Sequence, residues 1–117
     1  MSMLIPHFIH GQNTFGDSQR ASEVFNPATG QVTGRVPLAS TADVESAIAS
    51  AQAAFPAWAA TTPLNRARVM FKFKELLEKH ADEIAMAITR EHGRVLSGAK
   101  GELTRGLEVV GFACGSP

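Results

Sequence analysis

The sequence predicts a leading β-hairpin region followed by about four helices, on three observations. Between residues 6 and 37, short runs of alternating apolar and polar side chains are separated by glycine and proline, which is typical of hairpin strands. From residue 40 onward, apolar residues recur at three- and four-residue spacing, as on one face of a helix. Prolines and glycines divide this second part. The helices are therefore expected at about residues 40–55, 62–80, 81–92 and 97–115.

The strand region is organised around a turn at residues 26–30, Asn-Pro-Ala-Thr-Gly. Pro27 presets φ for the first central position of a type I turn, and Gly30 can take the left-handed conformation that closes a bulged hairpin. The strand that follows alternates, so one face is expected to be covered. That face carries Val32, Gly34 and Val36.

The first helix has both a start and a stop in the sequence. Ser40 is the expected N-cap, with Asp43 placed to reach back to the helix start. Pro56 is expected to end the helix, which leaves Trp58 in the connection as a packing anchor. A narrow apolar stripe, suited to close packing against a neighbour, contains Val44, Ala47, Ile48, Ala51 and Phe55.

The second and third helices are bounded in a similar way. Pro63 is expected to open the second helix, where its missing N–H costs little, and Gly93 to cap the third. The second helix has a charged, solvated side opposite a broad apolar face. That face contains Val69, Met70, Phe73, Leu76, Leu77 and His80.

The fourth helix is apolar around most of its circumference, so cover on nearly every side is expected. One stripe contains Leu103, Leu107, Val110 and Cys114, and Val109, Phe112 and Ala113 widen it. Arg105 is the exception. It can form i,i+3 ion pairs with Glu102 or Glu108 on a polar flank, or it can be held to meet an anionic ligand. Both interpretations stay open from the residues alone.

The length, the charge balance and the cysteine count of the chain argue against several classes of protein. The 117 residues are one domain or part of one, and the 11 basic and 11 acidic side chains cancel, which argues against a nucleic-acid partner. Basic residues of the second helix are interrupted by Glu75 and Glu78, so that face is a poor nucleic-acid surface. A single cysteine indicates a reducing compartment, the cytoplasm. No run of apolar residues is long enough to span a membrane.

The sequence does not support a phosphate loop, a metal site or a cysteine nucleophile. Residues 93–101 have glycines spaced as in a phosphate loop, but Ala99 follows the second glycine where that motif needs lysine. The four histidines are scattered, with no cysteine or carboxylate at ligand spacing, so no metal site is predicted. Cys114 lies late on an apolar stripe, unlike a reactive thiolate, and is predicted to be a small core residue.

Four segments carry a resemblance to the N-terminal segment of an aldehyde dehydrogenase. They are residues 25–30 (Phe-Asn-Pro-Ala-Thr-Gly), 54–58 (Ala-Phe-Pro-Ala-Trp), 66–68 (Arg-Ala-Arg) and 105–110 (Arg-Gly-Leu-Glu-Val-Val). The last segment is most similar to the CoA-acylating methylmalonate-semialdehyde dehydrogenases. The resemblance covers nearly the whole chain. It implies an α/β fold in which residues 1–117 form the N-terminal part of the NAD-binding domain.

The same resemblance implies a function for the complete enzyme. That function is NAD-dependent, CoA-acylating oxidation of methylmalonate or malonate semialdehyde to propanoyl-CoA or acetyl-CoA, as in valine catabolism, by a homotetramer. Arg105 matches the arginine that binds the substrate carboxylate. The family's nucleophilic cysteine, general base and main NAD contacts lie downstream, so no catalytic, cofactor or metal residue is assigned to this chain. An interruption at Pro117 is expected, and the chain alone is expected to be inactive.

A second hypothesis from a different class remains. The chain can be a small non-catalytic helical module, or a decayed remnant, that binds a partner through its apolar helices.

Overall fold

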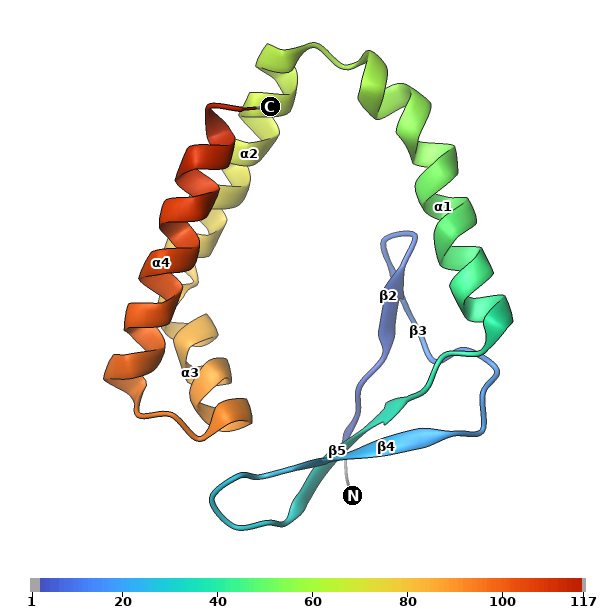
Figure 1. Cartoon of the computed structure of the whole chain (residues 1–117), viewed down its shortest axis with the longest axis vertical. Coiled ribbons are helices and arrows are strands. Elements are labelled where there is room, and N and C mark those ends of the chain that lie inside the picture. The colour runs from blue at the N-terminus through green and yellow to red at the C-terminus, as the bar shows by residue number, and fades with distance from the viewer. Residues whose placement is uncertain (1–2, 117) are drawn as a thin grey trace. The chain divides into compact units, whose positions relative to one another are not determined.

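The computed structural model describes residues 3–116, which divide between Ala60 and Thr61 into two compact units. Short strands come first and four α-helices follow within the described residues, which confirms the predicted order (Figure 1). The first unit holds β1 (Met3–Leu4), β2 (His7–Ile9), β3 (Gln12–Thr14), β4 (Ala21–Phe25), β5 (Val32–Pro37) and α1 (Thr41–Ala60). The second holds α2 (Pro63–Lys79), α3 (Ala81–His92) and α4 (Leu96–Cys114).

The first unit contains a sheet of order β1-β5-β4, in which β4 and β5 form the predicted hairpin. The turn residue Asn26 accepts on its carbonyl from the N–H of Gly30 at 2.8 Å, and its side-chain oxygen accepts from Ala28 N at 2.8 Å. Gly30 has a φ of 70°, so the left-handed conformation predicted for it is confirmed. The turn chemistry of residues 26–30 therefore sets the hairpin.

The parallel pairing of β1 with β5 was not anticipated, because a two-residue strand shows no alternation. Met3 lies opposite Gly34, and Leu4 opposite Arg35. A Cβ on Gly34 would lie 3.0 Å from the Met3 carbonyl oxygen, so glycine permits this close approach. The predicted covered face of β5 is only partly covered. Gly34 is buried and Val36 half-buried, but Val32, at the start of β5, is exposed.

A second hairpin, β2 with β3, turns at His10 and Gly11, which both have positive φ values of 54° and 73°. Two left-handed residues in sequence match the twist of a two-residue hairpin turn. His10 Nδ1 lies 3.1 Å from Ser50 Oγ of α1, which attaches the turn to the helix. The hairpin and α1 are thus joined within one unit.

The start of α1 confirms the predicted capping box. Asp43 Oδ2 accepts from the N–H and the hydroxyl of Ser40, both at 2.8 Å, and Asp43 N–H donates to Ser40 Oγ at 3.1 Å. The predicted end near residue 55 is wrong, because α1 continues through Pro56 to Ala60 and includes Trp58. The proline costs one backbone hydrogen bond, and the surrounding residues are strong helix formers: Ala53, Ala54, Ala57, Ala59 and Ala60.

The three helices of the second unit begin and end within a residue of the expected positions. Thr62 caps α2, with Pro63 in its first turn, and Gly93 ends α3 with a φ of 78°. Helices α2 and α4 lie side by side (Figure 1). Small residues fill the centre of this unit: Ala85, Ala99 and Cys114. Within residues 3–116 no large side chain is fully buried. None of the helices in that range contains an apolar stretch of the length that a bilayer span requires.

Candidate substrate-recognition site on α4

Helix α4 turns its first apolar stripe toward α2 and α3. Cys114 and Ala99 are buried, and the stripe residues between them are half-buried: Leu103, Leu107 and Val110. An ion pair at 2.7 Å between Lys100 Nζ and Asp82 Oδ1 adds a link between α4 and α3. The helix is therefore fixed on one side by its neighbours within the unit.

The other side of α4 is open to solvent. Val109 is 69% exposed and Phe112 is 78% exposed, and Arg105 is exposed on the same flank. The expectation that this helix is covered on nearly every side is therefore wrong for the part of the chain that the structure describes. The spacing 105, 109, 112 places a cation at the start of an uncovered apolar stripe.

Arg105 makes no hydrogen bond or ion pair with any residue in the range 3–116. Glu102, the expected i−3 partner, is instead bonded to Arg94, with 2.5 Å between Arg94 Nη1 and Glu102 Oε1. Glu108 makes no ion pair with Arg105 either. Neither predicted ion pair of Arg105 forms among the described residues, and Arg105 is exposed to solvent.

The backbone beside Arg105 is also uncrowded. A Cβ placed on Gly106 would meet no atom within 4 Å, and the same is true of Gly101 one turn earlier. The hydroxyl of Thr104 donates back to the Lys100 carbonyl at 3.0 Å and so does not reach outward. A ligand or another segment of chain can therefore approach the helix at this point.

The glycine-containing segment that leads into α4 does not fit a dinucleotide phosphate. It follows helix α3, not a strand, and Gly93 serves as the left-handed cap of that helix. The space beside Gly98 is taken by the side chain of Arg94, whose Cγ and Cδ would lie 3.2 Å from an added Cβ. The segment therefore lacks the open cradle of backbone N–H groups that a phosphate needs.

The structure also shows where the other candidate residues from the sequence lie. Cys114 is 4% exposed and unbridged, which confirms it as a core residue. His80 lies at the junction of α2 and α3 with its Nδ1 3.1 Å from Glu83 Oε1, so this helix-end histidine is paired at the surface and not packed on the apolar face. Among the described residues, no three histidine, cysteine or carboxylate side chains come together as metal ligands.

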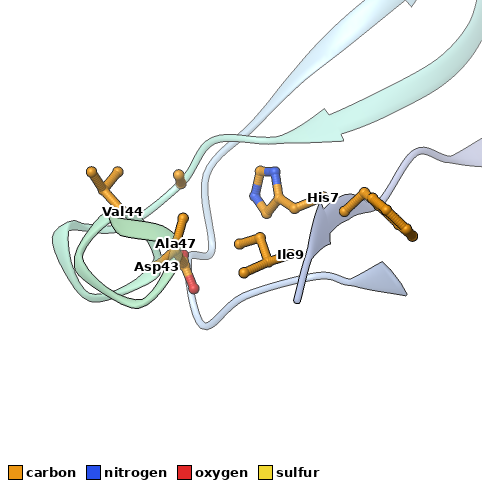
Figure 2. A pocket seen from close by; sticks show the side chains of 7 residues that line it. His7, Ile9, Asp43, Val44 and Ala47 are labelled. Carbon is orange, nitrogen blue, oxygen red and sulfur yellow. The ribbon is translucent and has the colours of Figure 1, made fainter. Parts of the chain in front are cut away.

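A hollow of about 280 Å³ in the first unit was missed by sequence reasoning (Figure 2). It lies between the β2 end and the start of α1 and is lined by His7, Phe8, Ile9, Ala39, Asp43, Val44 and Ala47. Hydrogen bonds from the Ser40 N–H and hydroxyl hold the pKa of Asp43 below its ordinary value of 3.8, with smaller contributions from His7 and the Asp17 backbone. The capping-box pattern identifies Asp43 in the sequence. His7 is far from Asp43 along the chain, so no local pattern predicts that the two lie in the same hollow.

The Asp43 carboxylate is committed to capping α1. It also fills the space beside Gly16, where a Cβ would come 2.5 Å from Asp43 Oδ2, and Gly16 has a φ of 64°. His7 Nε2 is buried without a hydrogen-bond partner in the described residues. We interpret this cluster as the junction that attaches the strands to α1, and not as a catalytic site.

The strands and the helices match an N-terminal part of a larger enzyme fold. The model of the family described as "Aldehyde dehydrogenase family" matches residues 15–117. The chain belongs to the aldehyde dehydrogenase family.

Three similar proteins indicate the branch. A malonate-semialdehyde dehydrogenase of Pseudomonas aeruginosa is 46% identical over 111 residues, 95% of this chain and 22% of the relative. The human mitochondrial acylating methylmalonate-semialdehyde/malonate-semialdehyde dehydrogenase is 44% identical over 107 residues, 92% of this chain and 20% of the relative. A Sinorhizobium meliloti structure complexed with NAD, assigned as a methylmalonate-semialdehyde dehydrogenase, is 50% identical with a TM-score of 0.95, covering 100% of this chain and 24% of that one.

The chain thus spans between a fifth and a quarter of the length of these relatives. The structure corresponds to an N-terminal part of the aldehyde dehydrogenase fold, which confirms the α/β class that the resemblance implied.

Proposed function

We propose that this chain supplies the N-terminal part of an NAD-dependent, CoA-acylating dehydrogenase of methylmalonate or malonate semialdehyde. Its role there is to form part of the NAD-binding domain and to present Arg105 to the carboxylate of the substrate. Support comes from three relatives whose names include malonate or methylmalonate semialdehyde and from the NAD complex of one of them.

The unpaired guanidinium of Arg105 is the observation that carries the proposal. Semialdehydes of this class have a carboxylate beside the aldehyde, and a planar guanidinium can donate two parallel hydrogen bonds to it. The ion pair between Arg94 and Glu102 engages one of the two competing carboxylates, and Gly106 leaves room for the substrate to approach. Arg105 would therefore bind and orient the substrate, not take part in bond breaking.

No residue of this chain is assigned to NAD or CoA. The segment at residues 93–101 does not fit a phosphate, and Cys114 is buried within the helices. We propose that the nucleophile, the general base and the cofactor contacts come from the part of the fold that lies downstream in the relatives. We further propose that the complete enzyme is a homotetramer in the cytoplasm.

The test uses a complete enzyme in which residues 1–117 replace the matched segment of the Pseudomonas aeruginosa dehydrogenase. Loss of a desolvated, charge-assisted contact costs on the order of 2–5 kcal/mol. Arg105→Leu should therefore lower kcat/KM for methylmalonate semialdehyde by roughly two orders of magnitude or more. The activity is measured as NADH formation in the presence of CoA.

Propanal, which has no carboxylate, is the control substrate. Arg105→Leu should lower kcat/KM for propanal far less, and Arg105→Lys should be intermediate because an ammonium lacks the fork geometry. Equal losses on both aldehydes, or no loss on either, would show that Arg105 does not bind the substrate.

The second candidate function is a non-catalytic helical module. The exposed apolar stripes of α1 and α4 favour it, since Ile48, Phe55, Val109 and Phe112 are all uncovered in the described residues. A complex of this chain with a partner unrelated to aldehyde dehydrogenases, in cells that contain no complementary segment, would favour the module.

A further inference from the structure

The ion pair between Arg94 and Glu102 joins the start of α4 to the connection that precedes it. Arg94 lies between α3 and α4, and its Nη1 is 2.5 Å from Glu102 Oε1. Its aliphatic stem runs beside Gly98, where the Cγ and Cδ atoms would lie 3.2 Å from an added Cβ. The lack of a side chain at position 98 therefore gives Arg94 the room to extend along the helix toward Glu102.

Glu102 has one alternative partner on its own helix. Side chains on a helix meet at spacings of three and four residues. The positions at those spacings from Glu102 are 98, 99, 105 and 106, and of these only Arg105 is a cation. The other cation of α4, Lys100, is at a different spacing and pairs with Asp82 of α3 at 2.7 Å. A Glu102 carboxylate released from Arg94 would therefore have Arg105 as its helical neighbour.

The order of the two residues along the helix favours that pairing. A carboxylate that precedes its cation pairs better than one that follows it, in keeping with the direction of the helix dipole. Glu102 precedes Arg105, whereas Glu108 follows it. Glu102 is therefore the stronger of the two competitors for Arg105, and it is the one that Arg94 engages.

We propose that Arg94 is a positioning residue for substrate binding. By holding Glu102, it prevents Glu102 from pairing with Arg105 and leaves the Arg105 guanidinium to the substrate carboxylate. Arg94 itself does not contact the substrate. The proposal rests on the proposed function of Arg105. A pair between Glu102 and Arg105 would lower the fraction of enzyme that is competent to bind, and the apparent affinity falls in proportion to that fraction.

The experiment measures KM and kcat of the chimeric enzyme that carries residues 1–117, with Arg94→Met, which keeps an unbranched stem and removes the charge. An exposed helical pair is formed in roughly two thirds of the molecules, so KM for methylmalonate semialdehyde should rise about threefold, and more where the site excludes water. The kcat should not change, because saturating substrate displaces Glu102 from Arg105. Propanal has no carboxylate and should show no change in either constant, which also shows that the variant is folded.

Two further variants separate the possible causes of such a rise. The double variant Arg94→Met/Glu102→Gln should restore the parent KM, because a glutamine amide has no charge with which to compete for Arg105. If Arg94 instead attracted the anionic substrate by its own charge, the double variant would stay as impaired as Arg94→Met. Arg90→Met is the matched control, since Arg90 is an exposed cation near the end of α3 that makes no ion pair with Glu102, and it should leave KM unchanged.

The outcomes separate the role of Arg94 from that of Arg105. A higher KM for methylmalonate semialdehyde alone, restored in the double variant, supports the proposal. An unchanged KM for Arg94→Met, an equal change on propanal, an equal rise in Arg90→Met, or a double variant that stays impaired would each overturn it. Arg105→Leu is measured in the same assay. A selective loss there with no effect of Arg94→Met overturns only the role of Arg94, whereas no selective loss there overturns the proposed function as well.

Discussion

Arg94 and Glu102 form an ion pair with 2.5 Å between Nη1 and Oε1, so Glu102 does not pair with Arg105 one turn further along α4. Helical spacing offers Arg105 two carboxylates, Glu102 and Glu108, and the first of them is bonded instead to Arg94, which lies just before the helix. The side chain of Arg94 lies beside Gly98 in the first turn of α4 and from there reaches Glu102. Arg105, which is proposed to bind the substrate, forms an ion pair with neither carboxylate among the described residues.

Removing the Glu102 carboxylate should matter little to stability or activity. Both side chains are about two-fifths exposed, and an exposed ion pair contributes about 0.2–1 kcal/mol. In the complete chimeric enzyme, Glu102→Gln should leave kcat/KM for methylmalonate semialdehyde within about threefold of the parent value, since that range corresponds to well under 1 kcal/mol. A loss as large as that caused by Arg105→Leu would mean that Glu102 positions Arg105.

The Asp43 cap should make the stability of this chain dependent on pH. Ser40 holds the folded-state pKa of Asp43 below 3.8, so the charged carboxylate stabilises the fold above that pH, and the contribution is lost as pH falls through the lowered pKa. Asp43→Asn keeps an acceptor oxygen but removes the charge. Its Tm should be lower than that of the parent at pH 7, and the difference should shrink by pH 2.

Ser40→Ala tests the other half of the cap. Removing the hydroxyl should cost about 1 kcal/mol at pH 7, as for other N-cap residues. Thermal unfolding followed by circular dichroism at both pH values measures the two variants. A difference between the parent and Asp43→Asn that stays constant from pH 7 to pH 2 would contradict the assigned cause.

Features that depend on a few neighbouring residues could be predicted from the sequence. The Ser40 and Asp43 capping box, the turn at Gly30 and the cap at Gly93 each rest on hydrogen bonds or a φ angle set within about five residues. Such geometry is local, so residue type alone indicates it. Arg105 is likewise evident from the sequence alone as the charged exception on an otherwise apolar side of α4.

Features that depend on distant segments could not be predicted. The pairing of β1 with β5 needs Gly34 opposite Met3, and a two-residue strand carries no pattern of its own. The partner of Glu102 is another such feature, since helical spacing allowed Arg105 and the structure has Arg94. Proline was expected to end α1 at residue 56, but the helix continues to Ala60. The alanine-rich residues on both sides favour the helix strongly enough to outweigh the effect of the proline.

Cys114 should behave as a structural residue. Its side chain is 4% exposed, so a thiol reagent should label the folded chain slowly and the denatured chain rapidly. Cys114→Ala should destabilise the chain by about 1 kcal/mol, the centre of the range for single substitutions, and leave the activity of the chimeric enzyme unchanged.

The isolated chain should make no NADH from methylmalonate semialdehyde and CoA. Production that Cys114→Ala abolishes would contradict this assignment.

The last prediction concerns Pro56, the proline inside α1. It has no N–H to donate to the carbonyl of Gln52, and its ring crowds that carbonyl, at a cost of up to about 3 kcal/mol in a helix interior. Because the surrounding residues are exposed, an alanine at this position meets no side chain that it would displace. Pro56→Ala should therefore raise both the helical ellipticity and the Tm of the 117-residue chain. Gln52→Ala is the matched control, since it alters the same turn but leaves the backbone bonding unchanged, and it should have little effect. An unchanged or lower Tm for Pro56→Ala would show that the proline is required for the fold of the first unit and is not a defect within its helix.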